Sequence, residues 1–380
     1  MTVFVGCGFA AKYREGGGNF SVPLQRMLGL RRIAADAIWL EVFPATDNPG
    51  ADRGAIRAFQ RQLRAHGLAE RYCLLYQAKR DQAHDLARCE IFGLSDLRAR
   101  LGGPNVLLNL SYSIHPPLLL EFERRIFCDI DPSEFFYWMT KMELGQSTHH
   151  AYWTIGLNFG ARDCLLPDTG LPWKTFLPLV DTELMRAQPR ASGGKFTTVG
   201  QWYWNGSVEV NGEFPDLSKR VAFEKYLALP QRVPGARFEL AMNMREDDPE
   251  RARLSGLGWQ VVDPHRVTSS AKRYRRYLAS ADAEFTAIKG VDVAWRTGWL
   301  SDRAAAFLAL GRPVITEDTG AARYLPPSNG FHFVQDLESA SDAVRRVQSD
   351  WKIESARARA TAQECFDGAR TLRRILAHDR

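Results

Sequence analysis

The chain has 380 residues, of which 45% are hydrophobic and 25% are charged, and its formal net charge is +6. This composition is typical of a globular protein and excludes a collagen-like, a disordered and a disulfide-stabilised chain. The modest positive charge is compatible with an anionic ligand and does not require nucleic acid. At roughly 150 residues per domain, the length predicts two domains.

No stretch approaches the run of about 18 apolar residues that a membrane-spanning helix needs, and the first residues carry no basic flank or cleavage site. We therefore expect a cytoplasmic protein with at most peripheral membrane contact. The six cysteines are scattered without metal-binding spacing. We expect neither structural zinc nor disulfides.

In the first half of the chain, short runs of β-branched and aromatic residues alternate with helical stretches. This alternation predicts an α/β fold in which helices connect the strands of a parallel sheet. The expected strands are 2–6, 37–42, 72–76, 106–110, 125–129 and 151–157. The expected helices are 20–34, 52–66, 83–99 and 132–143.

The segment 162–194 interrupts this rhythm with prolines and glycines, which predicts a connector. Alternation then resumes, with expected strands at 195–200, 238–242, 259–262, 314–316 and 330–333 and with helices between them. The final stretch, 353–376, has a helical composition. Two α/β units joined by a proline-rich connector are the simplest interpretation.

The sequence GGGN at 16–19 follows the first expected strand and precedes the first expected helix. Glycines let the backbone approach a ligand closely, and the first turn of a helix presents free N–H groups. The spacing is not that of a dinucleotide-binding fingerprint, and no P-loop lysine follows. Gly17, Gly18 and Asn19 are candidates for a loop that lines a ligand-binding cleft. A plain flexible turn is the alternative.

The segment 280–320 holds the strongest group of candidate residues. Ser301 precedes a run of small and apolar residues, so it is expected to cap a helix. The start of that helix offers N–H groups and the positive end of the helix dipole to an anion. Asp302, in the first turn, is a candidate acceptor for a ribose hydroxyl.

Three cations lie near this helix start in the sequence, namely Lys289, Arg296 and Arg303. Together with the helix they predict a site for a diphosphate. For the two arginines the alternative is ion pairing with Asp292 or Glu284.

Polar residues also follow the strand expected at 314–316. Asp318, Thr319 and Gly320 stand at its carboxyl end, where open α/β sheets bind ligands. They are candidates for binding a ligand in a cleft between the domains, although a capped turn uses the same residues.

At this point the sequence resembles a known family. WRTGWLSDR at 295–303 and LALGRPVITEDTG at 308–320 are similar to the donor-binding half of GT-B glycosyltransferases, and more narrowly to a bacterial group of them. The likeness extends to GGGNFSVPLQRMLGLRRI at 16–33, DIDP at 129–132, HHAYWTIGLNFG at 149–160, GKFTTVGQW at 194–202, GWQVVDP at 258–264 and ECFDG at 364–368.

The resemblance implies two Rossmann-like domains that face each other across a cleft. The acceptor domain is expected at 1–178, a linker at 179–194, the donor domain at 195–352 and a C-terminal helix that returns to the first domain at 353–380. It implies an enzyme that transfers a sugar from a nucleoside-diphosphate donor, UDP- or GDP-linked, to a small-molecule or glycan acceptor. No cofactor and no metal are expected.

Two features of the family pattern are missing. A glutamate that many GT-B enzymes carry on the donor helix is matched here by Ala306. Asp302 lies one turn earlier on the same face and is expected to replace it. The arginine and lysine often found beyond the first strand of the donor domain are also missing, since Gln201, Trp202 and Trp204 occupy that region. The three cations named above are then expected to neutralise the phosphates.

An inverting reaction also needs a base that accepts the proton of the acceptor. His149 and Asp131 are the candidates, and His150 and Glu15 are weaker ones. A packed histidine is the alternative for His149, and a helix cap is the alternative for Asp131. The DID spacing at 129–131 does not predict a metal site, because it ends a strand of the expected acceptor domain.

Two further residues complete the donor-binding set. Trp202 is expected to line the cleft, although tryptophans of such clusters more often pack in a core. Thr198 lies in the strand expected at 195–200.

Two rival functions remain open. One is a nucleotide-sugar epimerase of the same fold. The other is a non-catalytic nucleic-acid-binding protein that uses the basic run at 272–277. Nucleic acid is not the expected partner, because charged runs of this kind are usually a solvated helix face. The oligomeric state is open.

Overall fold

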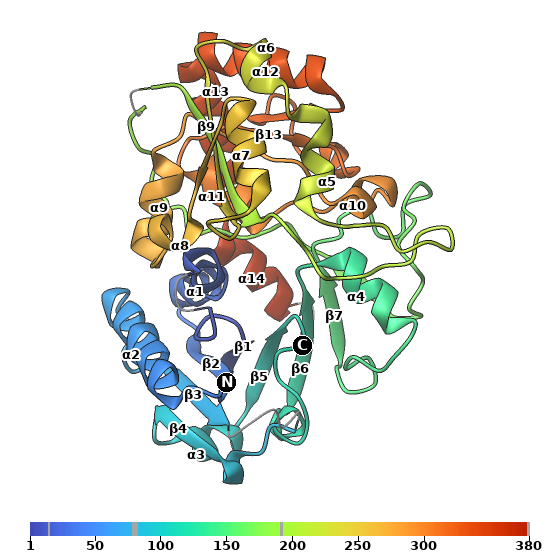
Figure 1. Ribbon diagram of the computed structural model, residues 1–380. Helices are drawn as coiled ribbons and strands as arrows, with labels where there is room; N and C mark the ends of the chain where they lie inside the picture. The colour runs from blue at the N-terminus through green and yellow to red at the C-terminus, as the bar shows by residue number, and fades with distance from the viewer. Residues whose placement is uncertain (14–15, 78–82, 191–192, 378–380) are drawn as a thin grey trace.

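The computed structural model describes residues 1–13, 16–77, 83–190 and 193–377. The chain forms two α/β units, each built on its own mainly parallel sheet, and the units lie one above the other in Figure 1. This confirms the fold class that the alternation of strands and helices predicted. Within the described ranges, no helix is long and apolar enough to cross a membrane.

The first unit contains an eight-stranded sheet in the order β4-β3-β2-β1-β5-β6-β7-β8. All neighbouring strands are parallel except β3 and β4, which pair antiparallel. The strands are β1 (Thr2–Cys7), β2 (Asp36–Pro44), β3 (Tyr72–Gln77), β4 (Cys89–Gly93), β5 (Asn105–Leu110), β6 (Arg124–Asp129), β7 (Ala151–Thr154) and β8 (Trp173–Thr175). Strand β8 lies in the segment expected to be a connector and extends the sheet by one short strand.

The helices of the first unit cover the sheet. They are α1 (Gly17–Arg32), α2 (Pro49–Ala65), α3 (Leu97–Leu101) and α4 (Pro132–Met139), with 3-10 turns at η1 (Leu86–Arg88) and η2 (Leu118–Glu121). The helix expected at 83–99 is wrong, because the chain there forms η1, β4 and the start of α3. Residues Cys89–Gly93 instead form hydrogen bonds with β3 as an antiparallel strand. Pairing between strands therefore overrides the local helix propensity of this segment.

The second unit contains a six-stranded parallel sheet in the order β11-β10-β9-β12-β13-β14. Its strands are β9 (Lys195–Gln201), β10 (Arg237–Asn243), β11 (Trp259–Val262), β12 (Ala283–Phe285), β13 (Val314–Glu317) and β14 (Phe331–Val334). The sequence did not predict β12, which has only three residues. It lies fully buried between β9 and β13.

The helices of this unit include two that bear directly on the site, α5 and α11. The full set is α5 (Lys219–Phe223), η3 (Glu224–Tyr226), α6 (Leu229–Arg232), α7 (Pro249–Gly256), α8 (Pro264–Val267), α9 (Ala271–Ala279), α10 (Gly290–Ala294), α11 (Asp302–Ala309), η4 (Ala321–Tyr324), α12 (Leu337–Ser349), α13 (Trp351–Cys365) and α14 (Gly368–Ala377). The helix expected at 353–376 is thus two helices, separated at Phe366 and Asp367.

The order of the strands shows where each sheet leaves a crevice that can hold a ligand. In each sheet the chain fills one side of a central strand and then the other, so the connections diverge between β1 and β5 and between β9 and β12. Helices cannot cover the carboxyl ends of the strands at such a point, and ligands of open α/β sheets bind there. The carboxyl ends of β9 and β12 are therefore the first place to examine.

The end of the chain crosses from the second unit back to the first (Figure 1), where α14 packs against α1. Two backbone hydrogen bonds fix the crossing, from the Val180 N–H to the Phe366 carbonyl at 2.8 Å and from the Gly368 N–H to the Val180 carbonyl at 3.1 Å. A Cβ atom at Gly29 of α1 would lie 2.7 Å from Leu372 and 3.1 Å from the Gly368 backbone. The two helices therefore approach closely because position 29 has no side chain.

We predict that Gly29→Ala destabilises the protein. Alanine in a helix interior gains about 0.5–1 kcal/mol over glycine, but overpacking against the Gly368 backbone costs about 1–3 kcal/mol, so the steric cost dominates. Denaturant unfolding measures the difference. Gly256→Ala in α7 is the matched control, because a Cβ there meets no atom within 4 Å. Equal or greater stability of Gly29→Ala would contradict the close packing of α14 on α1.

Candidate functional site

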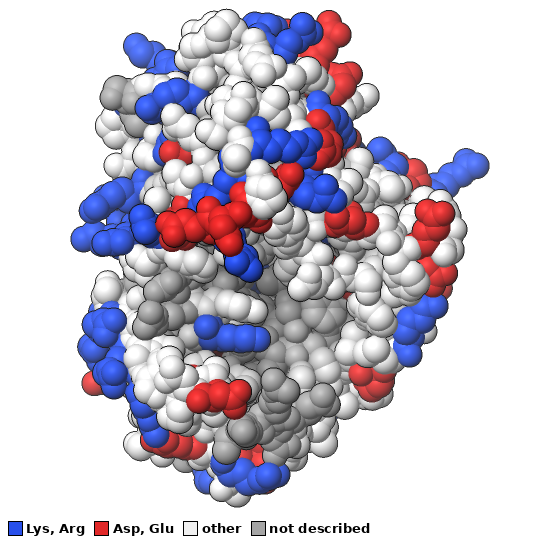
Figure 2. Space-filling model, viewed as in Figure 1, with Lys and Arg blue, Asp and Glu red and all other residues white. Residues whose placement is uncertain are grey.

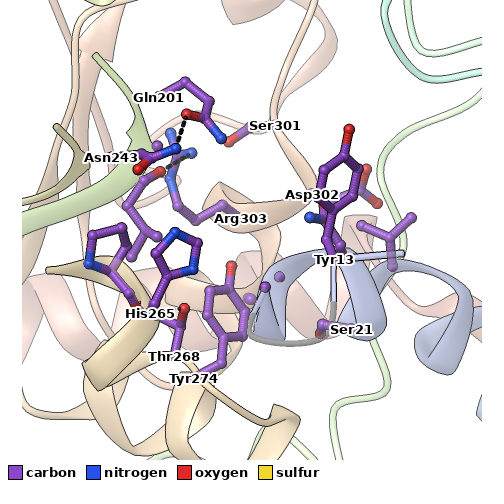
Figure 3. A pocket seen from close by; sticks show the side chains of 18 of the residues that line it. Tyr13, Ser21, Gln201, Asn243, His265, Thr268, Tyr274, Ser301, Asp302 and Arg303 are labelled. Carbon is purple, nitrogen blue, oxygen red and sulfur yellow. Dashed lines mark hydrogen bonds between the residues drawn. The ribbon is translucent and has the colours of Figure 1, made fainter. Parts of the chain in front are cut away.

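A cavity of about 540 Å³ lies between the two units at the carboxyl end of β9 (Figure 3). This volume is within the range of small-molecule sites. Figure 3 shows that one wall comes from the first unit, through Tyr13 and Ser21, and the other from the second. Its lining residues are Lys12, Tyr13, Gly16, Gly18, Asn19, Ser21, Val22, Gln25, Val199, Gly200, Gln201, Asn243, Pro264, His265, Thr268, Tyr274, Trp299, Ser301, Asp302, Arg303 and Ala306.

A smaller cavity of about 200 Å³ adjoins the first. Gly200, Gln201, Trp299 and Arg303 line both cavities, so these residues form a shared wall. The smaller cavity is otherwise lined by Asp131, Trp204, Leu217, Lys219 and Lys289. The two cavities together follow the crevice between β9 and β12 that the strand order indicates.

The start of α11 forms part of the shared wall. Ser301 caps this helix as expected, since its hydroxyl accepts a hydrogen bond from the Ala304 N–H at 3.0 Å. The first N–H groups of a helix have no partner within the helix, and the dipole makes this end positive. Arg303 lies in the same turn and lines both cavities, so the wall carries a guanidinium beside the N–H groups of the helix start.

A buried carboxylate orients Arg303. The Arg303 Nε donates to Glu284 at the centre of β12, and its Nη1 donates to the Val199 carbonyl at 2.7 Å. A further bond joins Nη2 to the Thr286 hydroxyl at 3.3 Å. Among the described residues, these bonds use three of the five N–H groups of the guanidinium, so two remain for a ligand. Arg303 therefore pairs with Glu284, which the sequence offered as an alternative to a ligand-binding role, and it also lines both cavities.

Lys219 is the cation that the sequence did not single out. It begins α5, lines the smaller cavity and donates to the Ala287 carbonyl at 2.6 Å and to the Thr286 hydroxyl at 3.3 Å. Both acceptors are neutral. Burial and the neighbouring Arg303 lower the pKa of Lys219 to about 7. Unlike Arg303, this ammonium has no carboxylate hydrogen-bond partner among the described residues.

The ribose candidate Asp302 lies on the wall of the larger cavity and faces the first unit. Its carboxylate lies 3.6 Å from the guanidinium of Arg26 on α1. Burial raises the pKa of Asp302, and the nearby Arg26 opposes the shift. The pair is too long for a direct hydrogen bond, and the Asp302 Oδ1 and Arg26 Nη2 atoms are buried without hydrogen-bond partners among the described residues.

Lys289 links the two units at the smaller cavity. Its ammonium donates to both carboxylate oxygens of Asp131, at 2.7 and 2.9 Å, and to Glu134 of α4 at 3.0 Å. The neighbouring carboxylates raise the pKa of Lys289 and outweigh the effect of its burial. Asp131 therefore lines the cavity as the partner of a lysine. Two acids and one lysine leave this wall with a net negative charge.

The far end of the larger cavity is polar and narrow. Asn243, at the end of β10, donates from its amide to the Gln201 side chain at 3.0 Å (Figure 3). His265 and Thr268 approach from α8 and the turn that follows it. None of these residues was a candidate from the sequence, because they come from separate segments at the ends of β9 and β10 and around α8, and no local spacing connects these segments.

The glycine-rich segment expected to be a loop instead forms the first turn of α1, with Gly16 as its cap, and it contacts the second unit directly. The Gly17 N–H donates to the Thr268 carbonyl at 2.7 Å, and a Cβ at Gly17 would lie only 2.4 Å from that oxygen. Gly18 and Asn19 line the larger cavity, whereas Gly17 holds the contact between the units. Glu15 lies outside the described residues.

His149 does not line either cavity. It is buried in the first unit, where its Nδ1 donates to the Gly145 carbonyl at 2.6 Å and its Nε2 accepts from the Asn109 amide at 3.1 Å. Burial lowers the pKa of His149 to about 4. The neutral ring thus has both nitrogens occupied, and the alternative of a packed histidine is correct. His150 is exposed and contacts Arg125.

Two further donor candidates are buried away from the cavities. Trp202 has no exposed surface and packs against Phe223 in the core of the second unit, so its expected place in the cleft is wrong. Trp202 directly follows the last residue of β9, and its ring joins the aromatic cluster of that core. Thr198 is also buried and donates to Glu284 at 3.1 Å, which places it behind Arg303.

The remaining candidates surround the cavities without lining them. Arg296 pairs with Asp163 at 2.7 Å and not with Asp292 or Glu284. It does not line either cavity, so it is not placed to bind a phosphate there. Asp318 accepts the Gly320 N–H at 2.9 Å in a capped turn, and Thr319 donates to the Trp299 carbonyl at 2.8 Å. This turn positions Trp299, which does line both cavities.

The basic run occupies α9. Tyr274 and Tyr277 of this helix are buried, whereas Lys272, Arg273 and Arg276 are exposed. Figure 2 shows Lys and Arg side chains gathered on this margin of the molecule, with acidic residues interspersed elsewhere. Tyr274 lines the larger cavity and Tyr277 packs in the core, so neither ring lies on the exposed basic face, and the run is a solvated face of an amphipathic helix.

Comparison with solved structures supports the architecture over the whole chain. The structure of HepE from Anabaena with UDP-glucose has a TM-score of 0.57 and 12% sequence identity, and the match covers 100% of this chain and 99% of that one. The chain has the GT-B fold. Sucrose-phosphate synthase from Thermosynechococcus elongatus matches with a TM-score of 0.52 and 14% identity over 99% and 98% of the two chains.

A third GT-B structure, the pneumococcal O-GlcNAc transferase GtfA with UDP and GlcNAc, matches with a TM-score of 0.56 and 9% identity over 100% and 98% of the chains. No protein-family model matches this chain, and no curated protein sequence matches it. The likeness therefore lies in the GT-B fold, which agrees with the resemblance found in the sequence.

We predict that His149→Ala lowers the stability of the protein and leaves both cavities intact, because His149 lines neither of them. The change removes a packed ring and two buried hydrogen bonds, which costs about 2–4 kcal/mol. Because the folded-state pKa of about 4 lies below the ordinary 6.5, the neutral form stabilises wild type above pH 6.5, and this advantage over the variant declines as pH falls from 6.5 towards 4.

Thermal unfolding at pH 7.5 and pH 5 measures both effects. His150→Ala is the matched control, because His150 is exposed and is expected to change stability little. A fully stable His149→Ala protein with abolished turnover would contradict the structural role and restore the histidine as a base.

Proposed function

We propose that the protein is a glycosyltransferase that uses a nucleoside-diphosphate sugar as donor. The observation that carries the proposal is a pair of neighbouring cations, Arg303 on the wall shared by the two cavities and Lys219 in the adjoining smaller cavity. Arg303 is held by Glu284, and Lys219 has neutral hydrogen-bond partners only. A buried cation without a counter-ion is unfavourable. A bound diphosphate supplies the missing charge at the start of α11.

The two cavities suggest how the donor is arranged. The diphosphate occupies the shared wall, the nucleoside extends into the larger cavity and the sugar enters the smaller one. In this arrangement Asp302, on the wall of the larger cavity, accepts from a ribose hydroxyl, and Arg26 behind it lies 3.6 Å from its carboxylate. Gln201 and Asn243 lie at the end left for the base. The bound UDP and UDP-glucose of the HepE structures support a donor of this class.

The proposed chemistry requires charge stabilisation more than covalent catalysis. As the bond between the anomeric carbon and the diphosphate oxygen breaks, negative charge grows on the leaving diphosphate. Arg303, Lys219 and the N–H groups at the start of α11 are already in place to stabilise that charge, so no reorganisation is needed. No described group of acidic, cysteine or histidine residues has the arrangement of a metal site.

Asp131 is the candidate base that lines the smaller cavity. An acceptor hydroxyl that approaches the anomeric carbon from the first unit would pass its proton to a carboxylate of this kind. Both carboxylate oxygens of Asp131 accept hydrogen bonds from Lys289, which orients the carboxylate at the cavity wall. The acceptor, a small molecule or a glycan, enters through the cleft between the units.

We predict that UDP or GDP raises the melting temperature of the wild-type protein and that Lys219→Met weakens this binding. Loss of one charged hydrogen bond costs about 1.5–3 kcal/mol, which corresponds to roughly a 10- to 100-fold higher Kd. Isothermal titration calorimetry measures the change. Arg220→Met is the matched control, because the Arg220 guanidinium pairs with Asp216 and does not line either cavity.

The same titration has a pH signature. A pKa of about 7 means that Lys219 loses its proton as pH rises above 7, so nucleotide affinity in wild type is expected to fall by up to about tenfold per pH unit there. In Lys219→Met this dependence is expected to vanish. No response to any nucleoside diphosphate in a thermal-shift panel would contradict the proposed function.

A further inference from the structure

We propose that the smaller cavity is a binding site for a single pyranose ring, with Trp204 and Trp299 as its apolar walls and Asp131 as an acceptor for sugar hydroxyls. The inference rests on the proposed function and deepens it. Sugars combine an apolar face of C–H groups with a rim of hydroxyls, so their sites combine aromatic rings with carboxylates and amides. The smaller cavity has this combination.

The two indole rings are fixed by the first unit. Trp204 donates from Nε1 to Glu134 at 2.5 Å, and Trp299 donates from Nε1 to the Ile130 carbonyl at 3.3 Å. Because both N–H groups are used in these bonds, the rings contribute only carbon surface to the cavity. Two tryptophans whose polar atoms are occupied form an apolar lining that suits the C–H face of a sugar.

Trp204 is exposed although it is anchored. Its surface is 40% accessible, and Lys289 lies over its ring with its Nζ 5.4 Å from the centroid. The indole belongs to the segment between β9 and α5, and this segment is held down by Val208 and Leu217, which pack with Tyr137 of α4. Trp204 thus presents an anchored aromatic ring at the edge of the smaller cavity, where a ligand can contact it.

Gly206 shows that the position of Trp204 is tightly defined. A Cβ at this residue would lie 2.2 Å from the Trp204 Nε1 and 2.6 Å from a carboxylate oxygen of Glu134. Only glycine therefore lets the chain turn past this hydrogen bond. The ring orientation is thus a property of the fold, which a stacking surface requires.

The polar lining matches the hydroxyls of a sugar. Asp131 accepts from Lys289 through both oxygens, and each oxygen keeps a further lone pair for a hydroxyl donor. Lys219 and Gln201 also line this cavity and add an ammonium and an amide to its polar surface. Because Lys289 neutralises part of the acidic charge, the wall binds neutral hydroxyls without attracting a second cation.

The ring can come from the donor or from the acceptor, and two measurements distinguish these sources. The test compares wild type, Trp204→Leu and the matched control Tyr203→Leu. Tyr203 is a neighbouring, 43% exposed aromatic that does not line either cavity. The first measurement is the ratio of Kd values for UDP and UDP-glucose, with GDP and GDP-mannose as the second pair. The second is saturation-transfer NMR with methyl glycosides of glucose, galactose, mannose and N-acetylglucosamine in the presence of the nucleoside diphosphate.

If the site holds the donor sugar, Trp204→Leu removes a roughly three- to tenfold affinity advantage of the nucleotide sugar over the nucleotide. If it holds the acceptor sugar, Trp204→Leu abolishes saturation transfer to the ring C–H protons of a bound glycoside. Tyr203→Leu behaves like wild type in both cases.

The proposal is overturned if Trp204→Leu changes neither the Kd ratio nor saturation transfer while nucleotide binding persists. It is also overturned if Trp204→Leu weakens UDP or GDP itself as strongly as the nucleotide sugar, which would assign the ring to the base. Wild-type protein that binds neither nucleotide would instead contradict the proposed function, so the two failures are separate.

Discussion

The buried carboxylate of Glu284 is the constraint on which the rest of the site depends. Glu284 lies on the short central strand β12, and it holds the Arg303 guanidinium against the carboxyl end of β9. A buried ion pair of this kind gains little net stability, because desolvation offsets the attraction between the charges. Its value lies in orientation. It directs the unused donors of Arg303 to the crevice where the two sheets leave room for a ligand.

The alternation of strands and helices was enough to predict two α/β units, because apolar runs of strand length report burial on both faces of a parallel sheet. The prediction was wrong where pairing partners decide the structure. The segment at 83–99 has helical composition, yet the ladder with β3 makes Cys89–Gly93 a strand. Strand β12 was missed because three residues carry no periodicity.

Residues of the candidate site could be predicted only where a local sequence pattern, such as a helix cap, also marks the ligand-binding position. Ser301 and Arg303 were identified because a helix cap is visible in the sequence. Lys219 was missed because no local motif marks it: it is the first residue of the short helix α5, and only the tertiary fold brings it to the smaller cavity. His149 and Trp202 were misplaced because composition does not reveal whether a side chain faces the cleft or the core.

A crystal structure with UDP or a UDP-sugar tests the central claim most directly. The account predicts the diphosphate within hydrogen-bond distance of Arg303, Lys219 and the first N–H groups of α11, with the ribose beside Asp302 and the base towards Asn243. A nucleotide bound elsewhere, with Arg303 and Lys219 making no contact with phosphate, would contradict it.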